Sequence, residues 1–168
     1  MVHSSIQSHR EVYHCSGAGS AQLTLPHHHQ DQGLMPRPDQ PLHRCPCGAD
    51  APYAGCCGRF LDVGQFPATA EALMRSRYVA YVRQRADYLL RTWHPATRPE
   101  GLDFSTESGQ WLGLKVVRVV AGRAEDEQGT VEFVARYKVG GKAYRLHEIS
   151  RFVREAGRWL YRDAEVTL

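Results

Sequence analysis

The 168-residue chain contains no apolar run that approaches the roughly 20 residues needed to cross a bilayer. Its first residues also lack the basic start and apolar stretch of a secretory signal peptide. Neither sign of charge dominates, because 21 basic residues stand against 18 acidic ones, a formal net charge of +3. This balance argues against a nucleic-acid partner. Together these features predict a cytoplasmic protein without a membrane partner.

The sequence also lacks the common catalytic signatures. It has no nucleophile elbow, phosphate loop, dinucleotide fingerprint or helical His-Glu-x-x-His. Apolar residues make up 42% of the chain and charged residues 23%, which is typical of a globular protein. The length suits one ordinary domain with a small appendage. Nothing in the sequence therefore requires an enzyme.

Residues 1–44 differ from the rest in composition. They hold seven of the nine histidines, and Ser, Gln, Gly and Pro fill most other positions. Such a segment buries too little apolar surface to offset the entropy of ordering, so we expect a disordered tail. We interpret His27–His29 as part of this solvated tail. Met35 is a candidate second start of translation.

Residues 67–168 have the pattern of one α+β domain. Thr69 is a candidate N-cap of a helix whose apolar residues recur at helical spacing, and a second short helix is expected over 87–92. We expect the arginines on other faces of the first helix to be solvated. These are Arg75, Arg77, Arg83 and Arg85.

After Gly109 the apolar period changes to two, the period of a strand. Gly140-Gly141 and Ala156-Gly157 are typical of tight hairpin turns. Helices followed by consecutive hairpins predict an antiparallel sheet with the helices packed on one face. The expected strands span 111–120, 129–139, 142–154 and 158–166.

Four of the five cysteines lie within 13 residues, at Cys45, Cys47, Cys56 and Cys57. This spacing is poor for disulfides, and a cytosolic protein keeps its thiols reduced. Four thiolates on a short loop suit zinc, whose binding energy can fold a segment that has no core of its own. Four protein ligands leave no open position for water, so the expected site is structural. A redox-active thiol cluster and an iron–sulfur cluster are the alternatives. We expect Cys15, in the tail, to be a free thiol.

The run Cys-Pro-Cys-Gly at 45–48, followed by Tyr53 and Cys56-Cys57-Gly58, resembles the SEC-C zinc motif. That motif occurs at the C-terminus of the preprotein-translocase motor ATPase. The resemblance implies that Cys45, Cys47, Cys56 and Cys57 hold zinc. Ala49-Asp50 stands where the motif usually has Ser-Gly. Asp tolerates a left-handed backbone better than most residues, so we expect the loop to form.

About 120 residues resemble the YchJ-like family. The resemblance rests on the runs at 67–78, 86–95, 111–114, 133–137 and 147–152, with Trp159 and Tyr161 behind them. It implies a SEC-C segment followed by a nuclear-transport-factor-2-like domain, a curved antiparallel sheet wrapped around helices as a cone. The expected divisions are a tail over 1–44, a zinc-binding knuckle over 45–58, a linker over 59–66 and the cone over 67–168. The chain departs from the family at Ile149 and has no second cysteine motif. The resemblance implies no established activity.

Cones of this kind often hold ligands between helices and sheet. The candidate pocket residues are Trp93, His94, Trp111, Arg136, His147, Glu148, Arg151 and Tyr161. His147 and Glu148 are adjacent on an expected strand and therefore point to opposite faces, with Glu148 inward. Arg136 or Arg151 could pair with Glu148, most simply as a buried ion pair that fixes the sheet. We interpret His94 as a hydrogen bonder that closes a loop, and the three tryptophans as core residues.

Three functions compete. The leading hypothesis is a zinc-binding, non-enzymatic adaptor, because the motif in the translocase contacts a chaperone and the ribosome and so implies a protein or ribosome partner. The alternative is a small-molecule-binding or enzymatic cone with a pocket around Trp93, Arg136 and Glu148. Nucleic-acid binding through zinc and arginines ranks last. If a zinc ligand is lost, we expect residues 45–58 to disorder and the cone to stay folded.

Overall fold

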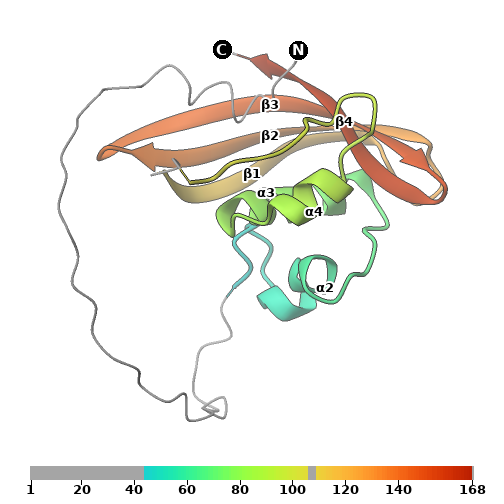
Figure 1. Cartoon of the computed structure of the whole chain (residues 1–168), viewed down its shortest axis with the longest axis horizontal. Coiled ribbons are helices and arrows are strands. Elements are labelled where there is room, and N and C mark those ends of the chain that lie inside the picture. The colour runs from blue at the N-terminus through green and yellow to red at the C-terminus, as the bar shows by residue number, and fades with distance from the viewer. Residues whose placement is uncertain (1–43, 106–108, 168) are drawn as a thin grey trace, which may run out of the picture.

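The computed structural model describes residues 44–105 and 109–167, so the expected tail lies outside the described residues except for Arg44. Short helices precede a long antiparallel sheet (Figure 1). The elements are the 3-10 helix η1 (Tyr53–Gly55), α2 (Gly58–Leu61), α3 (Ala70–Val82), α4 (Ala86–Arg91), β1 (Gln110–Ala121), β2 (Gln128–Val139), β3 (Lys142–Glu155) and β4 (Arg158–Thr167).

Helix α3 begins where the sequence predicted. The Thr69 side chain accepts a hydrogen bond of 3.1 Å from the backbone N–H of Ala72, which satisfies one of the free donors at the helix start. Leu73 and Val79 of this helix are fully buried. Helix α4 follows after a short turn, and both helices lie on the same face of the sheet (Figure 1).

The sheet is a simple meander in the order β1-β2-β3-β4, and all its pairs are antiparallel. This confirms the predicted α+β fold. The predicted turns also form, and Gly140 and Gly141 both take positive φ angles of 55° and 83°, as a two-residue hairpin turn requires. Along β2, alternate side chains from Val131 to Tyr137 are buried toward the helices. We call this side of the sheet the inner face and the opposite side the outer face.

No helix within the described ranges is long and apolar enough to cross a membrane.

The hairpin between β1 and β2 closes against the start of helix α3. Ala70 donates a backbone hydrogen bond of 2.9 Å to the Gly122 carbonyl. A Cβ atom on Gly129 would lie 2.5 Å from the Gly122 Cα, and one on Gly122 would lie 2.7 Å from the Ala70 Cβ. The first helix can therefore meet the sheet closely only because both hairpin positions lack a side chain.

Gly129→Ala should lower the free energy of unfolding by about 1–3 kcal/mol, because the added methyl group meets backbone that cannot move aside. Gly101→Ala is the matched control, since no atom lies within 4 Å of the Cβ it would add. Urea unfolding of both variants measures the difference. Equal stability of the two would contradict the close approach at this hairpin.

Candidate metal centre

The first two cysteines lie on a tight turn. Cys45 donates a backbone hydrogen bond of 2.9 Å to the Ala51 carbonyl, and Gly48 donates one of 3.2 Å to the Cys45 carbonyl. The left-handed backbone position of this turn is Gly48, with a φ of 81°. Asp50 therefore does not need the left-handed conformation that we expected it to tolerate. Its carboxylate forms an exposed ion pair of 3.2 Å with Arg44 instead.

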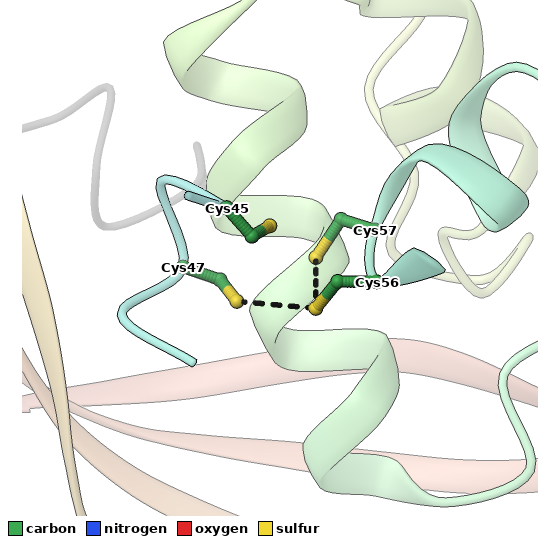
Figure 2. A group of neighbouring side chains, drawn as sticks. All are labelled: Cys45, Cys47, Cys56 and Cys57. Atoms are coloured by element: carbon green, nitrogen blue, oxygen red, sulfur yellow. Dashed lines mark hydrogen bonds between the residues drawn. The ribbon is translucent and has the colours of Figure 1, made fainter. Parts of the chain in front are cut away.

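The four cysteine sulfurs point toward one another from two segments of the knuckle (Figure 2). All four lie within 4.8 Å of one another. The Cys47 and Cys56 sulfurs are 3.6 Å apart, and those of Cys56 and Cys57 are 4.0 Å apart. Tetrahedral zinc with bonds of about 2.3 Å would place its sulfurs about 3.8 Å apart. These four cysteines can therefore hold a metal ion.

Electrostatics in the group favour a bound cation. The Cys57 thiol hydrogen-bonds the Cys47 sulfur and lowers the pKa of Cys47 to about 5, although burial opposes this. Burial raises the pKa of Cys56 to about 11, and its hydrogen bond to Cys47 acts in the same direction. The hydrogen bond to Cys47 and burial also raise the pKa of Cys57. One thiolate thus raises the free-energy cost of ionising the next thiol, because the two negative charges repel. A divalent cation would remove that repulsion.

A glycine sets the distance between the second cysteine pair and Tyr53. A Cβ on Gly58 would lie 2.8 Å from the Tyr53 ring, closer than real contacts allow. The Tyr53 hydroxyl donates a hydrogen bond of 2.7 Å to Asp62, and the Arg83 guanidinium lies 3.7 Å from the centre of its ring. Burial and the bond to Asp62 raise the pKa of Tyr53 to about 12, so the phenol stays a donor.

Arginines of α3, of α4 and of the turn between them dock the knuckle and α2 onto the cone. Arg75 donates to the Cys47 carbonyl at 2.9 Å, and Arg85 donates to the Leu61 carbonyl at 3.1 Å. Arg91 donates to the Phe60 carbonyl at 3.1 Å. Our expectation of a solvated arginine face is therefore wrong for Arg75 and Arg85.

The segment expected to be a linker, 59–66, begins inside helix α2. Phe60 and Leu61 are buried in the same core as Cys45, Cys47 and Cys57. This docking could not be read from the sequence, because the arginine targets are backbone carbonyls and carry no residue signature.

Inside the cone, Glu148 points to the inner face as predicted and is only 2% exposed. Its Oε1 accepts a hydrogen bond of 2.7 Å from the Ser150 hydroxyl. Its Oε2 has no hydrogen-bond partner among the described residues. Burial raises the pKa of Glu148 to about 7, against the opposing effects of Ser150 and the charge of Arg77.

Arg77 is the buried cation near Glu148, and the expectation that it is solvated is wrong. It is 5% exposed and donates to the Leu89 carbonyl at 2.8 Å and to the Thr92 hydroxyl at 2.9 Å. Its guanidinium also lies over a tryptophan and a tyrosine ring, at 4.8 Å from Trp93 and 4.5 Å from Tyr161. Arg77 follows Leu73 by four residues, so the helical spacing could have placed it on the buried stripe.

The cavity between α3 and the sheet has a volume of about 20 Å³. Arg77, Glu148, Ser150 and Tyr161 line it, together with apolar and aromatic side chains of the cone. This volume is room for about one water molecule and is far below the roughly 300 Å³ of small-molecule sites. This cavity is therefore too small for the ligand that the alternative of a ligand-binding cone requires.

The other predicted pocket residues lie elsewhere. Arg136 is exposed on the outer face, and Arg151 is exposed and pairs with Asp163, so neither reaches Glu148. His147 also faces outward, where its Nε2 lies 2.8 Å from Glu132.

His94 closes a loop, as we interpreted. Its Nδ1 accepts from the Ala96 N–H at 3.2 Å, and its Nε2 lies 3.0 Å from Glu155. Trp93 is buried with its ring against Tyr161. Trp111 is partly buried and packs against the core residues Tyr78 and Tyr137.

A family model described as YchJ, middle NTF2-like domain, matches residues 69–164. The chain belongs to the YchJ-like family. A UPF0225 protein from Chromobacterium violaceum is 58% identical over 120 residues, which are 70% of this chain and 88% of the relative. Another UPF0225 protein, from Ralstonia nicotianae, is 51% identical over 144 residues, which are 79% of this chain and 97% of that protein.

Two solved structures are also similar to this member of the YchJ-like family. The solution structure of a SEC-C motif containing protein from Rhodopseudomonas palustris matches with a TM-score of 0.66 and 35% identity, over 75% of this chain and all of that one. The crystal structure of a SEC-C motif containing protein from Psychrobacter arcticus matches with a TM-score of 0.60 and 28% identity, over 76% of this chain and 84% of that one.

Glu148→Gln should change how stability depends on pH. The folded chain holds the pKa of Glu148 near 7, against an ordinary value of 4.5, so folding takes up a proton between these values. The stability that Glu148 contributes is therefore full below pH 4.5 and is lost as the pH rises to about 7. Glutamine does not ionise and removes this loss. The free energy of unfolding of the variant, relative to that of the parent, should therefore rise by about 3 kcal/mol from acid to neutral pH.

Urea unfolding across this pH range measures the gain. Glu127→Gln serves as the control, since Glu127 is exposed. If the difference in free energy of unfolding between the Glu148 variant and the parent is the same at every pH, the pKa of Glu148 is not raised by burial.

Proposed function

We propose that this member of the YchJ-like family is a zinc-binding, non-enzymatic adaptor whose knuckle presents a rigid surface to a protein partner, free or on the ribosome. The observation that carries the proposal is the four-cysteine group, whose sulfurs are spaced for one tetrahedral ion and whose segment is docked on the cone. Zinc is the ion that fits best, because it prefers four thiolates and no redox chemistry is required. With four protein ligands the ion has no open position, so its role is structural.

The surface that follows helix α2 supports a protein partner. Val63 is 72% exposed and Phe66 is 58% exposed, directly after helix α2. The Arg158 guanidinium lies 4.0 Å from the centre of the Phe66 ring. Phe66 and Arg158 border a cavity of about 80 Å³, which is large enough for a small side chain but not for a cofactor. Apolar side chains next to an arginine are typical of the contact residues in protein interfaces.

The purified chain should contain one zinc per molecule, released only by a thiol-modifying reagent, because four cysteines close the site. Cys47→Ser should abolish this thiol-dependent zinc, whereas Cys15→Ser should retain it. Elemental analysis before and after thiol modification separates this metal from any metal held by the histidines of residues 1–44. Bound iron, or four titratable thiols without metal, would contradict a structural zinc site.

The double substitution Val63→Ser, Phe66→Ser should remove the partner without removing the metal. Quantitative mass spectrometry of proteins that copurify from a host-cell lysate tests this, with zinc content measured on the same preparations. Leu112→Ser is the matched control, because Leu112 is an exposed apolar residue on β1. Partners retained by the double variant, or lost equally with Leu112→Ser, would argue against this surface.

A further inference from the structure

The outer face of the sheet carries a group of five basic side chains. Strand register places them on one face, since Lys115 lies opposite Val134, Arg118 opposite Glu132, and Arg136 opposite Arg145. Lys138 follows Arg136 by two residues and so shares its side of the sheet. We call these residues the outer cations, and all five are exposed: Lys115, Arg118, Arg136, Lys138 and Arg145.

The described acidic residues of the outer face form no ion pair with the outer cations. Glu132 lies opposite Arg118 but bonds to His147 at 2.8 Å. On β4, Asp163 pairs with Arg151. Among residues 44–105 and 109–167, none of the outer cations forms an ion pair. Positive charge is therefore gathered over β1, β2 and β3. The acidic residues of the outer face are Glu132 on β2 and those on β4.

One pair in this group is unfavourable for the isolated sheet. Arg136 and Arg145 are direct cross-strand partners, and like charges in that position repel. The position opposite Arg136 on β1 is Gly113, so β1 provides no acidic side chain beside Arg136 at that position. A bound anion would turn this repulsion into two favourable contacts.

The positions of the outer cations determine which kind of anion they can bind. Neighbouring strands are about 4.8 Å apart and same-face residues about 6.7 Å apart along a strand, so cations spread over three strands exceed the reach of one small anion. In the described parts of β1, β2 and β3 the Phe, Tyr and Trp side chains belong to the core cluster and its neighbours. The imidazole of His147, which faces outward, is bonded to Glu132, so the outer face is a poor platform for stacking unpaired bases. The contacts available are with a phosphate backbone.

We propose that the outer cations bind the phosphate backbone of an RNA duplex. A sheet face has no protruding helix that could enter the major groove of B-form DNA. An A-form RNA duplex instead offers a wide, shallow minor groove bordered by phosphates, which a broad surface can contact. The formal net charge of the whole chain is only +3 because acidic residues elsewhere offset the positive charge of the outer face. A low net charge is therefore compatible with RNA binding at this face.

The test is fluorescence anisotropy of a labelled RNA duplex of about 20 base pairs, with the full metal-loaded chain. Contacts with about five phosphates should weaken binding at least about 100-fold between about 50 mM and 200 mM salt. Arg136→Glu replaces the Arg136–Arg145 repulsion with an attractive cross-strand pair, so the fold should not lose stability. It should nevertheless weaken RNA binding about 10-fold or more and flatten the salt dependence.

Arg98→Glu makes the same change of charge at an exposed loop residue outside this face and should bind RNA as the parent does. Several outcomes would overturn the proposal. These are no duplex binding at low salt, equal weakening by Arg98→Glu, an unchanged affinity in Arg136→Glu, tighter binding of a DNA duplex or of single-stranded RNA, or binding to phosphatidylglycerol vesicles in place of RNA.

Discussion

Hydrogen bonds from helix arginines to the carbonyls of the knuckle and α2 are the constraint on which the rest of this structure depends. Residues 45–61 are too few to build a core of their own, and they share the core of the cone instead. Arg75 and Arg91 satisfy carbonyl oxygens of Cys47 and Phe60 that would otherwise be costly to bury. The four-cysteine group and the cone are thereby one packed unit, and the surface around Phe66 has a fixed orientation to both.

Much of the fold could be predicted from local chemistry. Thr69 caps helix α3, and Gly140-Gly141 makes the hairpin turn. Both features were predictable because each position needs a particular residue type, which can be recognised in the sequence. The strand alternation from Val131 to Tyr137 likewise revealed which side chains face the helices. The cysteine cluster was predictable for a similar reason, since four close thiols have few structural uses.

Side-chain environments that depend on tertiary contacts were predicted less well. Arg77 was expected in solvent, because a charged side chain is normally exposed, but carbonyls and two aromatic rings surround it in the cone. Arg136 was expected near Glu148, although the alternation that buries its neighbours Ala135 and Tyr137 already places it on the outer face. The charge of that face emerges only from the register, which brings residues up to 30 positions apart, such as Lys115 and Arg145, onto one surface.

The bulges in β1 have a consequence for self-association. This strand is at one edge of the sheet, where unpaired backbone groups normally invite another chain to add a strand. Its pairing is interrupted between Trp111 and Gly113 and again between Val116 and Arg118. An irregular edge with exposed Lys115 and Arg118 is a poor template for a regular ladder, so the sheet resists edge-to-edge aggregation although Val117 and Val120 are exposed there.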